Sequence, residues 1–378
     1  MAFAACALLA LAACTPTPAP SAPGTRVPSA VSPTTSATTP GFTIAEHGTF
    51  NEPWALAFVP DSSLMLITER SGALKLRDSS SGQVRDVAGV PPVIHAGQGG
   101  LGDIAVSPTF ASDKMVYLSW VRAASGGSQA VVGRARLDES VPALVGLEVI
   151  WEQTTASGSG HFSHRIAFAD GHLFVTSGDR QAMAPAQGFD TNLGKVLRLD
   201  MDGRPAAGNP WASRGGVAAQ FWTMGHRNPL GIAVAPDGRL WSSEMGPAGG
   251  DELNLLIAGR NYGWPLVSMG SHYGGGTIPD HSPGDGFEAP KAWWVPAISP
   301  GSLMIYRGTL FQGWAGDAFL GGLSGQNLVR VHLDGDTATV AETWPMETRV
   351  RAVAEASDGA IWLLTDGSGG QLLELRPR

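Results

Sequence analysis

The chain has 378 residues, which is enough for one large β domain or two smaller domains. Hydrophobic residues make up 43% of the chain and charged residues 15%, a balance that supports a sizeable core and excludes global disorder. The formal net charge is −8 and no dense Lys/Arg run is present. We therefore expect no nucleic-acid partner, because phosphate contacts need clustered cations.

Residues 1–14, MAFAACALLALAAC, are almost wholly apolar but too short to span a bilayer. They predict a secretory signal, although no Lys or Arg precedes Arg26. Leu11-Ala12-Ala13-Cys14 is similar to the bacterial lipobox, in which the Cys becomes lipidated. We therefore expect export and a lipid anchor at Cys14, at the outer face of the cell membrane or in the periplasm. A simple cleaved signal is the alternative.

Residues 15–41 consist largely of Pro, Ser, Thr and Ala, a composition that cannot bury enough apolar surface to fold. We interpret this segment as an extended, disordered tether between the anchor and a folded domain. Both cysteines of the chain lie before the tether, at Cys6 and Cys14. The folded domain, predicted to span residues 42–378, therefore has neither a disulfide nor a cysteine-bound zinc ion.

One pattern recurs about six times from Phe42 onward: an apolar run, a turn that carries Asp or Gly, and a second apolar run. Its copies begin near residues 55, 104, 166, 232, 303 and 353. A spacing of roughly 50–60 residues leaves room for four short strands, which predicts an all-β, six-bladed β-propeller with four-stranded antiparallel blades. The 50 Gly and 27 Pro residues fit the many turns. We expect residues 42–44 to close the last blade against residues 372–375.

The first candidate catalytic group lies in the segment GSGHFSHR, residues 158–165. Small residues place His161 just before the apolar run that begins at Ile166. A neutral imidazole titrates in the range that a general base needs. The alternative is a hydrogen-bonded histidine of a turn.

Residues 224–265 hold the largest group of candidate site residues. Arg227 and Asn228 precede an apolar run, and a Gly/Pro loop with Gly246 and Pro247 precedes the carboxylates Asp251 and Glu252. Tyr262 follows ten positions after Glu252. Backbone carbonyls together with hard side-chain oxygens suit calcium rather than zinc. A solvated acidic turn is the alternative.

Two further segments complete the candidate site. Residues 266–300 form a long Gly/Pro-rich stretch with Tyr273, Trp293 and Trp294, which we interpret as a functional loop. Arg349 and Arg351 stand two positions apart, so on a strand both guanidinium groups point to the same face and can reach one anion. A charged stripe on an edge strand is the alternative.

Three motifs in this order, GHRNPLG, SEMGPAGGDE and GRNYGWP, resemble the soluble pyrroloquinoline quinone (PQQ)-dependent sugar dehydrogenases. This family includes the aldose sugar dehydrogenases and the glucose/sorbosone dehydrogenases. The resemblance extends over about residues 50–375. No Gly-x-Gly-x-x-Gly motif opens a helix after a strand, so a nicotinamide cofactor is not supported.

The resemblance implies oxidation of the anomeric hydroxyl of an aldose to a lactone, with His161 as general base, Arg227 stabilising developing charge, and PQQ as hydride acceptor. The implied cofactor-binding residues are Gln98, Arg227, Asn228, Tyr273, Leu323, Ser324, Arg349, Val350 and Arg351. The implied calcium ligands are Gly246, Pro247, Glu252 and Tyr262, the last through its carbonyl. Ser324 departs from the family, which commonly has a Lys there, so one charge-assisted contact to the cofactor is lost.

Two other functions are compatible with a tethered propeller. One is a calcium-dependent lactonase, which needs no paired arginines for a quinone. The other is a binding protein for glycans or proteins without catalysis, which leaves the order of His161, Arg227 and Glu252 unexplained. The sequence names neither the sugar nor the electron acceptor.

Overall fold

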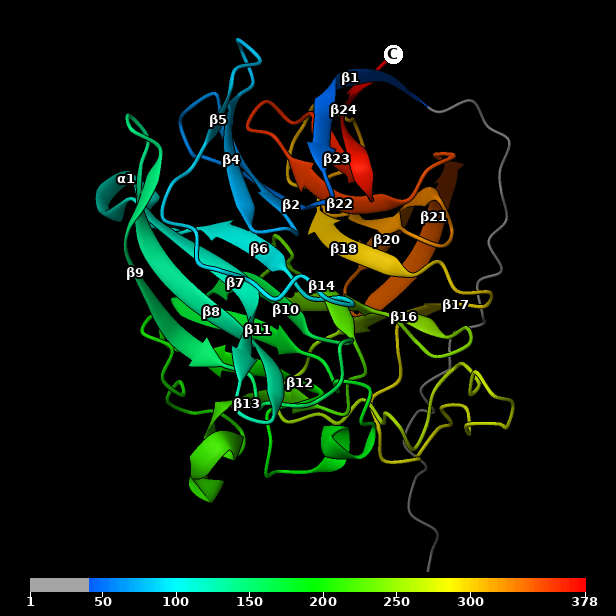
Figure 1. Cartoon of the computed structure of the whole chain (residues 1–378). Coiled ribbons are helices and arrows are strands. Elements are labelled where there is room, and N and C mark those ends of the chain that lie inside the picture. The colour runs from blue at the N-terminus through cyan, green and yellow to red at the C-terminus, as the bar shows by residue number, and fades with distance from the viewer. Residues whose placement is uncertain (1–40) are drawn as a thin grey trace, which may run out of the picture.

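The computed structural model describes residues 41–378, and within them the chain folds into six antiparallel sheets of four strands each. Figure 1 shows the sheets around a common centre. The predicted six-bladed β-propeller with four-stranded antiparallel blades is confirmed. The signal, Cys14 and the tether up to residue 40 lie outside the described residues.

The blades follow one another in chain order, each running from an inner to an outer strand. Blades 1 and 2 consist of β2 (Pro53–Phe58), β3 (Leu64–Glu69), β4 (Ala73–Asp78) and β5 (Val84–Asp86), then β6 (Leu101–Val106), β7 (Met115–Ala124), β8 (Gly127–Asp138) and β9 (Ala143–Glu152). Blades 3 and 4 consist of β10 (Ser163–Ala169), β11 (His172–Ser177), β12 (Lys195–Leu199) and β13 (Phe221–Met224), then β14 (Pro229–Val234), β15 (Leu240–Glu244), β16 (Asp251–Leu255) and β17 (Ala292–Trp294).

Blades 5 and 6 consist of β18 (Pro300–Ile305), β19 (Ala318–Gly322), β20 (Asn327–Asp334) and β21 (Thr337–Pro345), then β22 (Val350–Glu355), β23 (Ile361–Thr365), β24 (Ser368–Pro377) and β1 (Phe42–Asn51). The short helices α1 (Phe110–Asp113), η1 (Ala184–Gln187), η2 (Ala212–Arg214) and η3 (Gly216–Gln220) lie in connections. No helix within residues 41–378 has the length and apolar character needed to cross a membrane.

The inner strands β2, β6, β10, β14, β18 and β22 form a closed ring, in which each contacts the next. The repeated sequence pattern corresponds to these strands and to the second strand of each blade. Close approach at the centre requires small residues. A Cβ atom at Gly231 of β14 would lie 2.5 Å from the Cβ atom of Leu303 in β18, so glycine is needed there.

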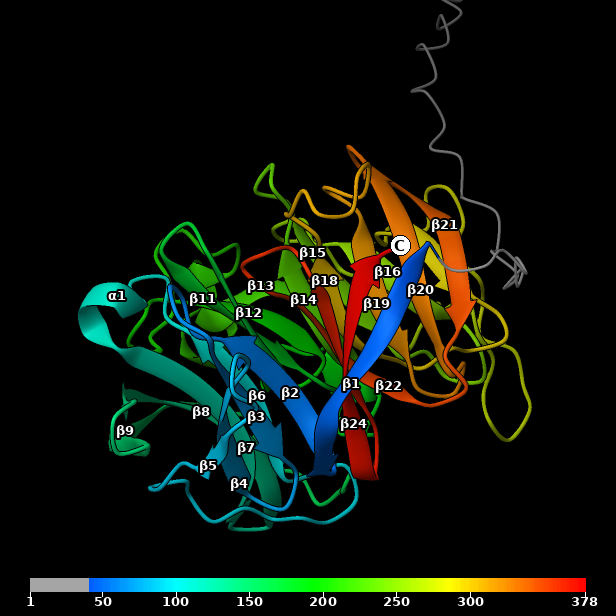
Figure 2. The ribbon, with the colours of Figure 1, turned by 90° about the horizontal axis from the view of Figure 1, so that it is seen from above.

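The two ends of the described chain close the ring. Strand β1 pairs with β24 in the last blade, with Phe42 opposite Pro377 and Ile44 opposite Leu375. Figure 2 shows β1 in blue beside β24 in red. The predicted closure of the last blade by residues 42–44 is therefore present, and the N-terminal strand provides its outer edge.

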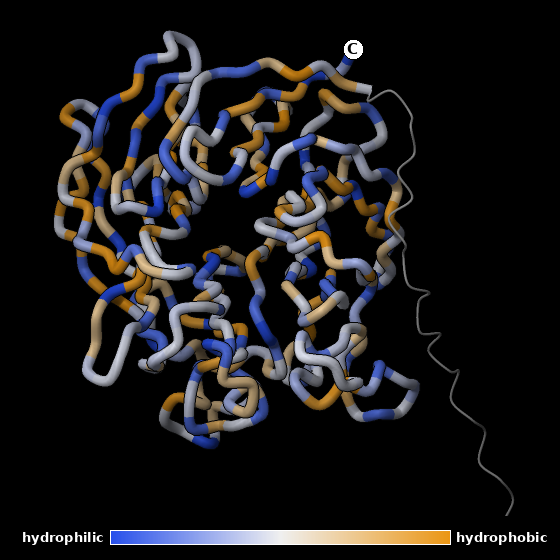
Figure 3. The backbone as a smooth tube through the Cα atoms, turned by 45° about the vertical axis from the view of Figure 1, so that its right-hand side comes forward, coloured by the Kyte–Doolittle hydropathy of each residue, from blue (hydrophilic) through white to orange (hydrophobic). Residues whose placement is uncertain are grey.

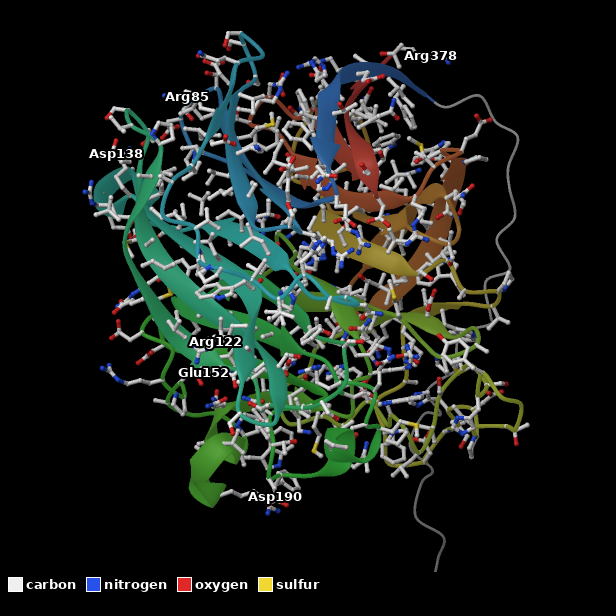
Figure 4. All side chains as sticks on the ribbon, in the orientation of Figure 1. Arg85, Arg122, Asp138, Glu152, Asp190 and Arg378 are labelled. Atoms are coloured by element: carbon white, nitrogen blue, oxygen red, sulfur yellow. The ribbon has the colours of Figure 1, made fainter. Side chains whose placement is uncertain are left out.

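The hydrophobic core is divided among the interfaces between blades. Six clusters of buried residues each join two neighbouring blades, including the cluster of blades 6 and 1 that closes the ring. Hydrophobic segments accordingly recur around the whole chain in Figure 3. Arg122 of β7 and Glu152 of β9 form an exposed ion pair, 2.6 Å apart, on blade 2 (Figure 4).

One expectation about the segment 266–300 was wrong. Trp293 and Trp294 belong to strand β17, where they pair with Glu252 and Asp251 and are almost completely buried. Both belong to the outer strand of blade 4, and Trp294 packs in the interface of this blade with blade 5. In the loop before them, residues 271–277, which include Tyr273, are exposed, whereas Ile278 and His281 are buried.

A buried arginine joins five of the six blades at the centre. Arg165 of β10 donates hydrogen bonds to Asp103 in β6, Leu230 O in β14 and Gly301 O in β18. Its guanidinium carbon lies 3.7 Å from the ring centre of Trp54 in β2. Burial raises the pKa of Asp103 and lowers that of Arg165, so removal from water opposes both charges. The hydrogen bonds offset this cost.

We expect Asp103→Ala to destabilise the protein by about 3–5 kcal/mol, because it leaves Arg165 buried without its counter-charge. Urea unfolding followed by circular dichroism measures the change. Asp358→Ala is the matched control, since it breaks an exposed pair with Arg376, and we expect a loss of less than about 1 kcal/mol. Equal losses for the two variants would contradict the role of Arg165.

Candidate functional site

The candidate residues lie on one face of the propeller. The first two strands of each blade are antiparallel, so the loop before an inner strand and the loop after a second strand lie at the same end of the blade. Gln98, His161, Arg227 and Arg349 precede inner strands, and Met245 follows a second strand. A central cavity of about 310 Å³ opens among these loops. Its lining comprises Trp54, Arg70, Gly97, Gln98, Phe162, Ser163, His164, Leu230, Met245, Ser299, Leu323, Arg349, Arg351 and Asp366.

The segment before β10 has an unusual backbone. His161, Ser163 and His164 have φ values of 48°, 60° and 56°, in the left-handed region that costs a non-glycine residue roughly 1–2 kcal/mol. Gln98 Oε1 accepts a hydrogen bond from the His161 N–H at 2.7 Å. Arg180 donates to the carbonyls of Gly158 and Gly160. Backbone strain fixed by its surroundings is typical of functional sites.

The imidazole of His161 is oriented by a buried carboxylate. Its Nδ1 atom lies 2.6 Å from Asp179 Oδ1. The same carboxylate accepts hydrogen bonds from the Gln181 N–H and from Trp264 Nε1–H, both at 2.8 Å. An ionised carboxylate can only accept, so His161 Nδ1 is the donor of this bond, and Nε2 is the ring nitrogen left to take up a proton. This arrangement suits a general base at Nε2.

Arg227 and Asn228 lie next to this group. The Arg227 carbonyl accepts a hydrogen bond from the Asp179 N–H, and its guanidinium lies 5.4 Å from the ring centre of Trp264. Arg227 Nη2 donates to the hydroxyl of Tyr273 at 3.4 Å, although the Tyr273 side chain is 75% exposed. Asn228 Oδ1 accepts from Ser163 Oγ at 3.0 Å. The structure thus brings together both predicted catalytic residues.

Arg349 and Arg351 point to the same face, as the i, i+2 spacing predicts. Their Nε atoms donate to the two oxygens of Asp366, at 2.8 and 2.9 Å. Burial lowers the pKa of Arg351. Burial also acts to raise the pKa of Asp366, but the two arginines outweigh it and hold that pKa below its ordinary value. Asp366 neutralises one of the two positive charges.

The other predicted cofactor-binding residues differ in their access to the central cavity. Leu323 lines it, whereas Val350 is buried in the interface between blades 5 and 6. Ser324 Oγ lies 2.7 Å from Ser299 Oγ and donates to Ala297 O, and it is absent from the cavity lining. The Ser324 side chain therefore bonds to the neighbouring segment 297–299 and does not face the central cavity.

The four predicted calcium ligands surround a second, smaller cavity. Gly246, Pro247, Glu252 and Tyr262 line a space of about 10 Å³, about the size of a single ion or water molecule. Asp251 holds this loop by accepting hydrogen bonds from the N–H groups of Gly246 and Ser299. The Tyr262 hydroxyl bonds to the backbone of Leu255 and Ile257, so only its carbonyl is available.

The buried carboxylate of Glu252 fits a cation in the small cavity. Burial raises the pKa of Glu252, and the nearby Glu244 carboxylate adds to this effect. Its described hydrogen-bond partner is Asn254, whose Oδ1 atom is buried without a partner. No three His, Cys, Asp or Glu side chains within residues 41–378 form a metal-binding group. One carboxylate with several carbonyls is a donor set that suits calcium.

Sequence reasoning missed three residues of the site. Asp179 and Trp264 orient His161, and Arg70 brings a third guanidinium to the central cavity. Arg70 also donates to the carbonyls of Gly97 and Gly99 beside Gln98. Asp179 follows β11 and Arg70 follows β3, each at a second-strand end. That shared position is a signal that the repeat pattern already contained.

The fold and the site define a six-bladed propeller with a histidine–carboxylate pair beside an arginine-lined cavity. Comparison with known proteins gives the family: residues 50–374 match the Glucose / Sorbosone dehydrogenase family. Aldose sugar dehydrogenase YliI of Escherichia coli K12 is 35% identical over 339 residues, which cover 87% of this chain and 91% of that protein. The chain belongs to the glucose/sorbosone dehydrogenase family.

Solved structures agree with this assignment. The apo-form of the soluble aldose sugar dehydrogenase of Escherichia coli has a TM-score of 0.85 at 34% identity, over 89% of this chain and all (100%) of that chain. The PQQ-bound aldose sugar dehydrogenase of Streptomyces coelicolor has a TM-score of 0.74 at 29% identity, over 89% of this chain and 98% of that chain. One relative with this fold is therefore known in a PQQ-bound form.

Proposed function

We propose that this protein oxidises the anomeric hydroxyl of aldose sugars to lactones, with PQQ as the hydride acceptor and calcium as a second cofactor. The observation that carries this proposal is the His161–Asp179 pair beside a cavity lined by three arginines. Relatives that are named aldose sugar dehydrogenases, one of them PQQ-bound, support it.

The chain's own residues would perform the proton chemistry. His161 Nε2 takes the proton of the anomeric hydroxyl as a hydride leaves the same carbon, so that a carbonyl forms. Asp179 holds the imidazole in the required tautomer and stabilises the imidazolium. PQQ, when bound, supplies the electrophilic carbon that accepts the hydride.

The central cavity fits PQQ because its arginines can neutralise the carboxylates of that cofactor. Arg70, Arg349 and Arg351 would hold the carboxylates, and a planar guanidinium pairs with a carboxylate through two parallel hydrogen bonds. Gln98 and Leu323 would contact the rest of the cofactor from the cavity wall. Arg227, Asn228 and Tyr273 would complete the site from the neighbouring loops.

Glu252 would hold calcium together with the carbonyls of Gly246, Pro247 and Tyr262. The bound ion would act as a Lewis acid towards the cofactor. We also propose that the protein is exported and anchored through Cys14, and that its electrons pass to an acceptor outside the cell membrane or in the periplasm.

Replacing His161 with Gln removes the lone pair of Nε2 but keeps a polar side chain of similar length. We expect turnover with aldoses to fall by roughly 10²–10⁴-fold while PQQ still binds, because general-base catalysis contributes that range. Dye reduction at saturating PQQ and calcium measures turnover. His172→Gln, at the start of β11 and at the other end of the blade, is the matched control. Full turnover in His161→Gln would show that another group is the base.

Glu252→Gln should weaken calcium binding at least tenfold, because the change removes the one carboxylate among the proposed ligands. Thermal unfolding measured over a range of calcium concentrations reports binding without substrate, since a ligand of the native state raises Tm. Asp280→Asn, an exposed carboxylate of the same loop region, should leave the calcium dependence unchanged. Identical calcium titrations for Glu252→Gln and the unaltered protein would contradict the assignment.

A further inference from the structure

A second histidine, His164, lies in the floor of the central cavity. Its side chain lines the cavity together with Trp54 and Leu230, which belong to inner strands. The imidazole stacks on Trp54, with ring centres 5.3 Å apart and an angle of 12° between the planes. Gly102 leaves the necessary space, because a Cβ atom there would overlap the ring of His164. The position and tilt of the ring are therefore fixed.

The hydrogen bonds of Ser119 determine which ring nitrogen of His164 carries the proton. Ser119 is fully buried, and its Oγ atom accepts a hydrogen bond from the Asp103 N–H at 2.8 Å. The same Oγ atom lies 2.8 Å from His164 Nδ1. A hydroxyl has one hydrogen to donate, and Nδ1 is its available acceptor among the described residues. Nδ1 therefore accepts, and Nε2 carries the hydrogen.

The Nε2–H group of His164 has no protein partner among residues 41–378. None of the described hydrogen bonds involves Nε2, and it is absent from the polar atoms that are both sealed from solvent and unpaired. Its donor therefore faces the cavity. Burial, with a further contribution from the positive charge of Arg165, lowers the pKa of His164 to about 3. The imidazole is therefore neutral under ordinary conditions, and towards the cavity it offers a donor, Nε2–H.

We propose that His164 is a cofactor-positioning residue whose neutral Nε2–H donates a hydrogen bond to an acceptor oxygen of bound PQQ. This inference rests on the proposed function, because it takes PQQ as the occupant of the cavity. Arg349 and Arg351 would hold the carboxylates of the cofactor from the wall of the cavity. A rigid donor in the floor selects one orientation of a planar ligand.

The contrast with His161 separates the two histidines chemically. Asp179 makes the Nδ1 atom of His161 a donor, so Nε2 is a base. Ser119 makes the Nδ1 atom of His164 an acceptor, so Nε2 is a donor. The two rings stand three positions apart in one left-handed segment but carry opposite tautomers. His164 cannot replace His161 as the base.

The test compares PQQ binding to the full-length protein and to His164→Phe, which keeps the aromatic stack on Trp54 but lacks the donor. Isothermal titration calorimetry with PQQ in saturating calcium gives the dissociation constant without turnover. We expect His164→Phe to bind PQQ about five- to tenfold more weakly, the usual effect of one lost hydrogen bond. His164→Gln retains a donor and should recover most of the affinity. His172→Phe is the matched control.

A second readout distinguishes a donor from a structural role. Because His164 stays neutral, the dissociation constant of PQQ for His164→Phe divided by that for the unaltered protein should be constant from pH 5 to pH 8. In the unaltered protein, nitrogen-15 NMR should show a protonated Nε2 whose hydrogen shifts when PQQ is added. That NMR measurement also decides the matter if His164→Phe does not fold.

Several results would overturn this inference. One is an unchanged PQQ affinity in a folded His164→Phe variant. Another is a larger effect of His164→Phe on the KM for the sugar than on PQQ binding, because the Nε2–H group would then bind the substrate and not the cofactor. If the ratio of the PQQ dissociation constants of His164→Phe and the unaltered protein changes with pH near 6.5, the His164 imidazole gains a proton in that range and is not the neutral donor proposed. If the unaltered protein fails to bind PQQ, the proposed function fails; if only the variant comparison fails, the role of His164 fails alone.

Discussion

The buried pair of Arg165 and Asp103 is the interaction on which the rest of this molecule depends. The hydrophobic core is divided into separate clusters, one at each interface between blades. A link at the centre is therefore needed to hold the inner strands of different blades together. Arg165 provides that link through contacts to blades 1, 2, 4 and 5 from its own place in blade 3. The same contacts with Trp54 and Leu230 form the underside of the central cavity.

The chemistry of the site follows from this rigid floor. His161 and His164 lie directly before Arg165, in a segment whose left-handed residues persist only because neighbouring blades hold them. Gln98 from blade 2 and Asn228 from blade 4 bond to this segment on either side. Two imidazoles held by fixed hydrogen bonds, with arginines in the adjoining cavity, form a pre-organised polar site.

The sequence predicted the architecture well because the blade repeat is a local pattern that recurs along the chain. The closure of the last blade followed from the geometry of a closed ring and not from a sequence signal. The sequence also predicted four residues of the central cavity lining, Gln98, Leu323, Arg349 and Arg351, and the four proposed calcium ligands that line the smaller cavity. The repeat pattern marked the second-strand ends that carry Asp179 and Arg70, but it could not show their contacts, because these depend on which loops the ring brings together across blades. The contact of Ser119 with His164 likewise joins two blades and leaves no pattern in the sequence. Trp293 and Trp294 were mistaken for loop residues because strand β17 is only three residues long.

Reconstitution of the full-length protein tests the central claim most directly. The protein is stripped of metal, supplied with calcium and then titrated with PQQ, while quinone absorbance and aldose-dependent dye reduction are recorded together. The account predicts uptake of one PQQ per chain and dye reduction only when PQQ, calcium and an aldose are all present. Absence of PQQ uptake at micromolar concentrations, or dye reduction that is independent of the quinone, would contradict it.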